Sequence, residues 1–389
     1  MKFSKRMDKF GVNIFSTLAD KRAALVAKGM EVIDLSVGTP NIPPAPHIIK
    51  AMCSAAENPQ NYIYAIKDTD ALKKAVAQWY ARRYDVQLNP LTQVVSLLGS
   101  QEGLAHIALS IVDEGDVVLV PDPCYPVFAD GPGIAGAELY YMPQLAQNGY
   151  MIDLDAIPPE ICQKAKLMVV SYPNNPTTAM ATPDFYKKLI AFAKKNEIIV
   201  LHDNAYSELV FDGARCGSFL SYEGAIEVGV EFNSLSKTYG LAGARCGFCV
   251  GNEEVVRNLT ILKSNMDYGM FLPIQQAAIA AITGDQSCVK TTCDAYQRRR
   301  DVLIKGFASI GWQIEKPKAT MFVWAPLPCG YTDDEAFALE LMEKSGVIVT
   351  PGSAFGPGGK GHVRMALVQQ EATINTAVAR IAASGMLKR

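Results

Sequence analysis

A single lysine lies among serines and glycines in the stretch FNSLSKTYGLAGARCGF, which covers residues 232–248. This lysine, Lys237, follows a short apolar run, and Arg245 comes eight positions later. A lone lysine is most often a solvated surface charge. In a loop of small hydroxylated residues at the end of a buried strand, however, its amine can form a Schiff base with an aldehyde. The elements around it decide between these two interpretations.

Short apolar runs recur along the middle of the chain and show little alternation, as is typical of strands buried on both faces of a parallel sheet. Helical patterns separate them, such as 69–84, with apolar residues at i, i+3 and i+4, and 183–196, which Thr182 caps and Pro183 begins. This alternation predicts a three-layer α/β/α fold with a mostly parallel central sheet. The predicted strands are 94–98, 117–120, 167–170, 198–201, 230–233 and 247–250.

The two ends of the chain differ from this middle part. After about residue 290 a long basic helix is followed by short strands near 320–325, 347–350 and 362–368, which predicts a smaller α+β domain. The first 47 residues contain an early helix and then a proline-rich extended segment. We therefore expect three parts: an N-terminal arm belonging with the small domain (1–47), a large domain (48–290) and a small C-terminal domain (291–389).

Polar residues follow most of the predicted strands. Ligands of an open parallel sheet bind outside the carboxyl ends of its strands, so these polar groups should meet in one cavity. Each group alone is a weak signal, and their convergence is what favours a functional site. In chain order the groups are Ser100 and Gln101, Tyr125, Asn175, Asp203 and Tyr206, and Ser234, Ser236 and Lys237.

This set of side chains matches what pyridoxal 5'-phosphate needs from a protein. Lys237 would form the Schiff base, and Asp203 would keep the pyridine nitrogen protonated. Tyr206 would lie near the phenolic oxygen, and Tyr125 would stack on the ring. The phosphate would be held by backbone N–H groups, hydroxyls and a fixed positive charge, from Ser100, Gln101, Ser234, Ser236 and Arg245. An amino-acid substrate also brings an α-carboxylate, for which Arg364 and Asn175 are the candidates.

Four motifs carry a family resemblance, in the order YPNNPTT around Asn175, HDNAY around Asp203, SLSKTYGLAGAR around Lys237 and PGSAFGPGGKGHVRMAL around Arg364. With them the chain resembles the class I/II aminotransferases, the fold type I pyridoxal-phosphate enzymes, from about residue 30 to the C-terminus. The resemblance implies a homodimer with both active sites at the interface. It also implies that the Gly38 backbone lies near the substrate carboxylate.

The resemblance further implies that Tyr64 reaches the cofactor phosphate of the neighbouring subunit, with Tyr62 as the competing candidate. The chain departs from the family in three places: Thr178 stands where glycine is usual, the usual glycine after the interface tyrosine is missing in 62–72, and Ala244 stands where many relatives carry tryptophan. The implied activity is transfer of an amino group from an L-amino acid to a 2-oxo acid, of the LL-diaminopimelate or alanine type. The alternative is a carbon–sulfur β-lyase on the same fold, which would share the cofactor residues.

Several other classes of function are disfavoured. The net charge of −2 gives no electrostatic footprint for nucleic acid or anionic membrane, and no apolar run approaches the roughly 20 residues of a membrane helix. A GxGxxG match at 131–136 does not directly follow a strand, which argues against a nicotinamide enzyme. About 30 residues precede the family-like region, too few for the DNA-binding domain of a cofactor-sensing transcription regulator.

Cysteine and histidine usage gives two further expectations. Nine cysteines without a repeating spacing, and no secretion signal, favour reduced thiols in the cytoplasm. The single CxxC at 246–249 falls in a predicted buried strand, and the four histidines are scattered. The sequence therefore predicts no metal site.

Overall fold

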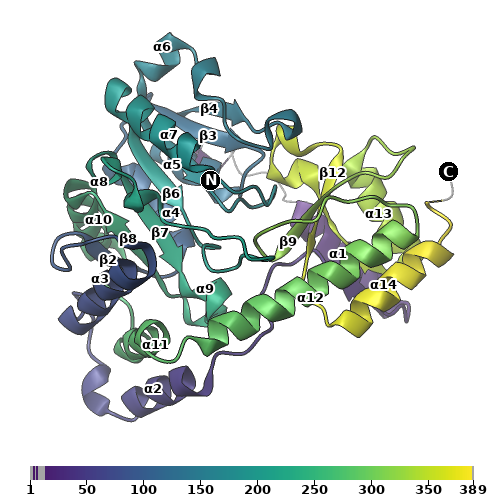
Figure 1. The fold of residues 1–389 in the computed structure, drawn as a ribbon, viewed down its shortest axis with the longest axis horizontal. Helices are drawn as coiled ribbons and strands as arrows, with labels where there is room; N and C mark the ends of the chain where they lie inside the picture. Colours follow the sequence, from purple (N-terminus) through teal and green to yellow (C-terminus); the bar gives the residue numbers. More distant parts are fainter. Residues whose placement is uncertain (1–2, 5, 8–13, 388–389) are drawn as a thin grey trace.

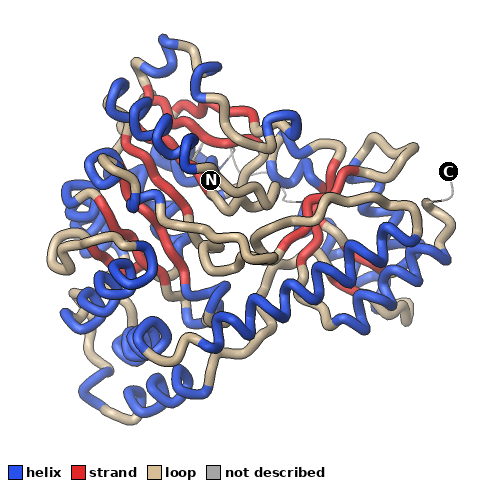
Figure 2. The backbone as a smooth tube through the Cα atoms, viewed as in Figure 1, coloured by secondary structure: helices blue, strands red, loops and turns tan. Residues whose placement is uncertain are grey.

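A seven-stranded sheet forms the centre of the larger part of the molecule (Figures 1 and 2). The structure is a computed structural model, and it describes residues 3–4, 6–7 and 14–387. The strand order is β2-β8-β7-β6-β5-β3-β4, and β8 runs antiparallel to both of its neighbours while the other pairings are parallel. The strands are β2 (Val94–Leu97), β3 (Val117–Asp122), β4 (Glu138–Pro143), β5 (Ala165–Ser171), β6 (Ile199–Asp203), β7 (Gly229–Ser234) and β8 (Gly247–Gly251).

Helices cover both faces of this sheet, so the predicted three-layer α/β/α fold is confirmed. Successive residues of β3 point to opposite sides, with Val118 and Val120 in one apolar cluster and Leu119 in another. The first face is covered by α4 (Ser100–His106), α5 (Val127–Ala135) and α10 (Glu253–Met266). The second is covered by α3 (Asp70–Tyr84) and α7 (Pro183–Asn196), with α2 (Pro46–Ala56) and α11 (Leu272–Thr283) packed outside.

A second group of elements, which we call the C-terminal lobe, lies to one side of the main sheet (Figure 1). Its three-stranded antiparallel sheet has the order β11-β12-β9, and a separate parallel pair joins β1 to β10. The N-terminal strand therefore pairs with a segment more than 300 residues away. The elements are α1 (Ile14–Ala27), β1 (Ile33–Asp34), β9 (Phe322–Pro326), α13 (Asp334–Ser345), β10 (Val347–Ile348), β11 (Thr350–Pro351), β12 (His362–Ala366) and α14 (Glu371–Ala383).

The long helix α12 (Ser287–Ser309) runs from the main body into the C-terminal lobe (Figure 1). The sequence predicts a basic helix here, but its Arg300 is fully buried. Nη1 of Arg300 donates to Asp212 at 2.8 Å, and Nη2 donates to Asp301 at 2.8 Å. The charge is therefore paired on two sides, as a buried guanidinium requires, and the pairing ties the helix to the loop at Asp212.

Local signals fix several of the helix ends. Thr182 Oγ1 accepts the N–H of Phe185 at 3.2 Å and Pro183 begins α7, as predicted. The GxGxxG match lies inside α5 and at its end, before the edge strand β4, so it forms no dinucleotide-binding turn. Three short helices complete the main body, α6 (Pro159–Cys162), α8 (Ala225–Val228) and α9 (Leu235–Thr238). Within the described residues, no helix combines the length and apolarity needed to cross a bilayer.

Candidate active site

A cavity of about 240 Å³ lies where the ends of several main-sheet strands face the C-terminal lobe. Apart from Tyr64, every residue that the sequence predicts for the site lines this cavity. They are Gly38, Ser100, Gln101, Tyr125, Asn175, Asp203, Tyr206, Ser234, Ser236, Lys237, Arg245 and Arg364. The carboxyl ends of parallel strands meet at one edge of the main sheet, which brings the main-sheet residues together. Gly38 and Arg364, more than 300 positions apart, reach the same space from the N-terminal segment and from β12 of the C-terminal lobe.

Lys237 stands on the short helix α9, directly after β7, and its side chain enters the cavity. Nζ donates to the carbonyl oxygen of Gly38 at 2.9 Å. Burial, with a smaller contribution from the positive charges of Arg364 and Arg245, lowers the pKa of Lys237 to about 8. A buried lysine with a lowered pKa is a much better nucleophile near neutral pH than a surface lysine.

Asp203 ends β6 and is almost fully buried. Its Oδ1 accepts the backbone N–H of Ala205 at 3.2 Å. Burial raises the pKa of Asp203 to about 6. A buried carboxylate facing a cavity, with one neutral donor, is suited to a ligand that brings a positive charge.

Tyr206 lies one turn after Asp203 and also borders the cavity. Burial raises the pKa of its phenol well above the usual range, and the charge of Arg364 acts in the opposite direction. Its ring meets Phe322 edge-on at 5.8 Å between centroids. Tyr125 follows the carboxyl end of β3 and donates from its hydroxyl to Gln101 Oε1 at 2.9 Å.

The part of the cavity near Arg245 is shaped by closely packed backbone. Gly99 has a φ of +77°, and a Cβ built on it would lie 2.3 Å from Nη2 of Arg245. A Cβ on Gly247 would lie 3.0 Å from the backbone nitrogen of Ser100. Ser234 accepts the N–H of Ser236 at 3.2 Å, which fixes the start of the lysine-bearing turn. Only glycine fits at these two positions, so N–H groups, hydroxyls and a guanidinium surround a space suited to a phosphate.

Arg364 enters from β12 of the C-terminal lobe and is buried between two aromatic rings. Its guanidinium carbon lies 4.1 Å from the ring centre of Phe322 and 4.5 Å from that of Phe355. Nη1 donates to Asn175 Oδ1 at 2.8 Å, and Nη2 donates to the carbonyl of Ser36 at 3.0 Å. Nε is buried and has no hydrogen-bond partner among the described residues, which is uncommon for a buried donor.

Tyr64 lies outside the cavity with 80% of its surface exposed. Its ring packs against Tyr268 at 5.9 Å. Tyr62 is also exposed, but its hydroxyl donates to the carbonyl of Ala56 at 2.9 Å within the same chain.

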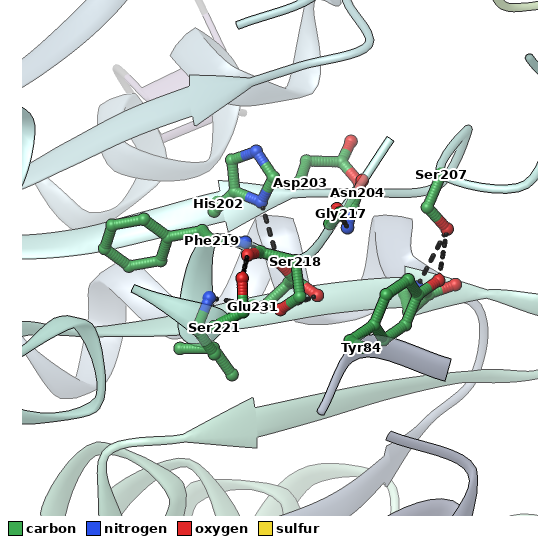
Figure 3. Close-up of polar contacts among 12 residues, drawn as sticks. Tyr84, His202, Asp203, Asn204, Ser207, Gly217, Ser218, Phe219, Ser221 and Glu231 are labelled. Carbon is green, nitrogen blue, oxygen red and sulfur yellow. Dashed lines mark hydrogen bonds and ion pairs between the residues drawn. The ribbon is translucent and has the colours of Figure 1, made fainter. Parts of the chain in front are cut away.

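A buried polar cluster supports the strand ends that carry the site (Figure 3). His202 and Glu231 are cross-strand partners on β6 and β7, both fully buried, with Nδ1 of His202 3.0 Å from Oε2 of Glu231. Ser218 Oγ and the N–H of Phe219 also donate to this carboxylate, at 2.9 Å each. His202 is therefore a core residue, and it braces the strand that ends in Asp203.

The family model described as "Aminotransferase class I and II" matches residues 30–381. The chain belongs to this family. It is therefore a pyridoxal-phosphate-dependent aminotransferase, with the fold type I architecture that the sequence predicts. The cavity fits the cofactor on three structural observations: a buried carboxylate without a cationic hydrogen-bond partner among the described residues, two serine hydroxyls and the Arg245 guanidinium in its lining, and a buried lysine amine.

Full-length relatives and solved structures agree with this assignment. The chain is 45% identical over 98% of its length to an LL-diaminopimelate aminotransferase of Dehalococcoides mccartyi, of which it covers 98%. It is 46% identical over 95% of its length to the enzyme of the same name from Syntrophobacter fumaroxidans, again covering 95%. Among solved structures, substrate-bound BacF from Bacillus subtilis is 38% identical, with a TM-score of 0.95 and 98% of each chain covered.

Sequence reasoning missed one aromatic wall of the site. Phe322 lines the cavity and stacks on Arg364, yet its position at the start of a strand carries no distinctive signal. Phe355 lies in the glycine-rich motif around Arg364, but the sequence does not predict its contact with the guanidinium.

Thr178 stands where the family usually has glycine, and its φ is +64°. Glycine adopts this left-handed conformation without strain, whereas a β-branched residue is held there at a cost.

Proposed function

We propose that this aminotransferase accepts LL-diaminopimelate as amino donor and passes the amino group to a 2-oxo acid. The support for this donor is the similarity to the LL-diaminopimelate aminotransferases over nearly the whole chain. The observation that carries the reaction itself is that the Lys237 amine, the Asp203 carboxylate and the Arg364 guanidinium border one cavity of about 240 Å³.

In this proposal each side chain has one task. Lys237 would hold the cofactor through its amine, and its free amine would accept the proton of the substrate α-carbon on Nζ as a general base. Asp203 faces the ring nitrogen, Tyr206 the phenolic oxygen, and Tyr125 the face of the ring. Arg364 and Asn175 bind the α-carboxylate, with the Gly38 backbone beside them. The bound cofactor supplies an electron sink for the α-carbon. The phosphate is held by Ser100, Gln101, Ser234, Ser236 and Arg245.

We further propose that the enzyme is a homodimer and that Tyr64 reaches the phosphate of the neighbouring subunit. The support is an exposed apolar patch, because contiguous exposed aromatic and aliphatic groups are typical of an interface. Its two segments are joined by a hydrogen bond from the Gly269 N–H to the Ala65 carbonyl at 2.8 Å. Tyr64 is preferred to Tyr62, whose hydroxyl is used within its own chain. The patch consists of Tyr62, Ile63, Tyr64, Ile66, Tyr268 and Phe271.

Two further features of the proposal concern organisation and location. The division into an arm (1–47), a large domain (48–290) and a small domain (291–389) is supported by the separate apolar clusters of the main body and the C-terminal lobe. A cytoplasmic location is supported by nine cysteines that are all unpaired.

The proposed function is tested by visible absorbance of wild type and Lys237→Ala with added pyridoxal phosphate. We expect wild type to be yellow, to bleach with LL-diaminopimelate and to recover with a 2-oxo acid, whereas Lys237→Ala lacks this band. Lys360→Ala, which removes an exposed lysine near Arg364, is the control and should match wild type. Bleaching by alanine or aromatic amino acids but not by LL-diaminopimelate would overturn the proposed donor. An unchanged spectrum for Lys237→Ala would overturn the role of the lysine.

A further inference from the structure

A buried cluster of charged residues lies behind the start of α4, outside the cavity. Lys263 of α10 has a side chain that is only 5% exposed. Its Nζ donates to Glu102 Oε2 at 2.8 Å and to Asp267 Oδ1 at 3.1 Å. His106 Nδ1 lies 3.1 Å from the other oxygen of Glu102. Burying a lysine is costly unless its charge is well paired, so this arrangement calls for an explanation.

The cluster resembles a metal site in its residue types. Oxygen and nitrogen atoms of Glu102, His106 and Asp267 lie within 4.8 Å of one another. The Lys263 ammonium, however, donates to two of these three residues. The positive charge at the centre of the cluster is therefore a residue of the chain itself, and the cluster acts as a structural brace.

Glu102 connects this brace to the turn between β2 and α4. Its Oε2 also accepts the backbone N–H of Leu98 at 3.0 Å. In a capping box, a carboxylate at the third helical position accepts the N–H of the N-cap residue. Glu102 instead accepts the N–H of the residue before the N-cap, and the N-cap residue Gly99 has no side chain to accept the helix N–H groups. The turn is thus held from outside by Glu102, and its inner face carries no capping side chain.

The Arg245 guanidinium lies against the same turn, because a Cβ on Gly99 would lie 2.3 Å from Nη2. Ser100 and Gln101, the next two residues, line the cavity. The position of these two residues therefore depends on a turn that packs against Arg245 and is tied to the Glu102–Lys263 pair by the Leu98 N–H.

We propose that Glu102 and Lys263 are positioning residues that hold Ser100 and Gln101 in place for the cofactor phosphate. This rests on the proposed assignment of Ser100, Gln101 and Arg245 to the phosphate. Neither Glu102 nor Lys263 lines the cavity, so both act through the backbone of the turn. Loss of the pair should weaken binding of a phosphate-bearing ligand and spare a ligand without phosphate.

The test compares pyridoxal 5'-phosphate with pyridoxal, which lacks the phosphate, by absorbance titration of the full-length protein. The variants are Lys263→Met and the double variant Glu102→Gln/Lys263→Met, which leaves no unpaired charge from this pair. We expect the dissociation constant for pyridoxal phosphate to rise about tenfold, as is typical when a residue that orients a binding group is lost. The constant for pyridoxal should stay within about twofold of wild type.

Lys290→Met is the matched control. Lys290 and Asp294 have the same i, i+4 spacing as Lys263 and Asp267, with Nζ 2.6 Å from Oδ2, but their side chains are 79% and 47% exposed. An exposed pair of this kind contributes little, so both ligands should bind as in wild type.

Three results separate the possible failures. If the folded double variant binds pyridoxal phosphate like wild type, or loses affinity for both ligands equally, the positioning role is wrong. Arg245→Met, measured alongside, should lose affinity only for the phosphate-bearing ligand. If Arg245→Met loses that affinity and the double variant does not, the phosphate assignment stands and the inference fails. If Arg245→Met has no effect, the phosphate assignment is wrong and the inference fails with it.

Discussion

Arg364 on β12 donates from Nη1 to Oδ1 of Asn175 at 2.8 Å, although the two residues belong to opposite sides of the site. Asn175 follows a strand of the main sheet, whereas Arg364 comes from the C-terminal lobe. This bond orients the guanidinium, and the rings of Phe322 and Phe355 enclose it. A carboxylate bound at Arg364, as we propose for the substrate, would meet a donor whose direction is fixed before binding.

Replacing Arg364 by lysine tests this relationship. Lysine cannot form a two-pronged bond or fill the space between the two rings. We expect KM for the amino acid to rise about 100-fold, since a paired charged hydrogen bond is lost, while cofactor affinity stays near that of wild type. Steady-state kinetics with a cofactor titration provide the measurement.

The control is Arg299→Lys. Arg299 is also buried and donates to Asn41 Oδ1 at 2.8 Å, but it does not line the cavity. It should lower stability without changing KM. Equal rises in KM for the two variants would contradict a specific role for Arg364.

Gly99 provides a test of the phosphate cradle. In Gly99→Ala the new methyl group would force Arg245 to move, because it would lie 2.3 Å from Nη2. The backbone conformation at φ +77° adds a strain of about 1–2 kcal/mol. We expect the variant to bind pyridoxal phosphate at least tenfold more weakly, measured by absorbance titration.

Gly115→Ala separates these two effects. Gly115 has a similar φ of +89°, but a Cβ there would meet nothing within 4 Å. This control should show the loss of stability in thermal unfolding but bind the cofactor normally. Cofactor binding weakened equally in both variants would mean that strain alone, and not the contact with Arg245, is responsible.

The positions of the site residues were largely predictable, whereas the contacts between them were not. The rule that ligands bind at the carboxyl ends of parallel strands placed Ser100, Asp203 and Lys237 together, because each comes within four residues after a predicted strand. The bond from Lys237 to the Gly38 carbonyl joins positions 199 residues apart, and no local pattern encodes it. The edge strand β4 was missed for a related reason, since most of its residues are partly or fully exposed and it lacks the buried apolar run of the inner strands.

Asp203→Asn should stabilise the cofactor-free protein in a pH-dependent way. Burial raises the pKa of Asp203 to about 6 from a usual value of 3.8, so the folded protein favours the protonated carboxyl. The penalty for ionising Asp203 is absent below about pH 4, grows as the pH rises and is complete above about pH 6. Because one pH unit corresponds to about 1.4 kcal/mol, the variant should be more stable by roughly 3 kcal/mol at pH 8 and equal to wild type below pH 4.

Denaturant unfolding of the cofactor-free protein across this pH range measures the effect. Asp212→Asn is the control and should change the free energy of unfolding in the opposite direction. Hydrogen bonds from Arg300 lower the pKa of Asp212, so the ionised form of this carboxyl stabilises the fold. This variant should be less stable than wild type at pH 8, and the difference should shrink as the pH falls below about 4.

Asp203→Asn should also bind pyridoxal phosphate more weakly, because it removes the carboxylate for the ring nitrogen. Equal stability of wild type and Asp203→Asn at pH 8 would contradict a buried, ionised Asp203.

The two exposed tyrosines of the apolar patch provide the test of the dimer. Tyr64→Phe removes a hydroxyl that we propose to reach the phosphate of the neighbouring subunit, so cofactor affinity should fall about tenfold with the dimer intact. Tyr62→Phe removes a hydroxyl that donates to Ala56 within its own chain and should leave cofactor affinity unchanged.

Ile66 belongs to the same patch, and its side chain is 62% exposed in the single chain. Ile66→Asp places a charge in the patch and should shift the protein towards monomers in sedimentation experiments. If these monomers bind the cofactor as tightly as wild type, Tyr64 acts within its own subunit or not at all. If Tyr62→Phe and not Tyr64→Phe weakens binding, the assignment of the two tyrosines must be exchanged.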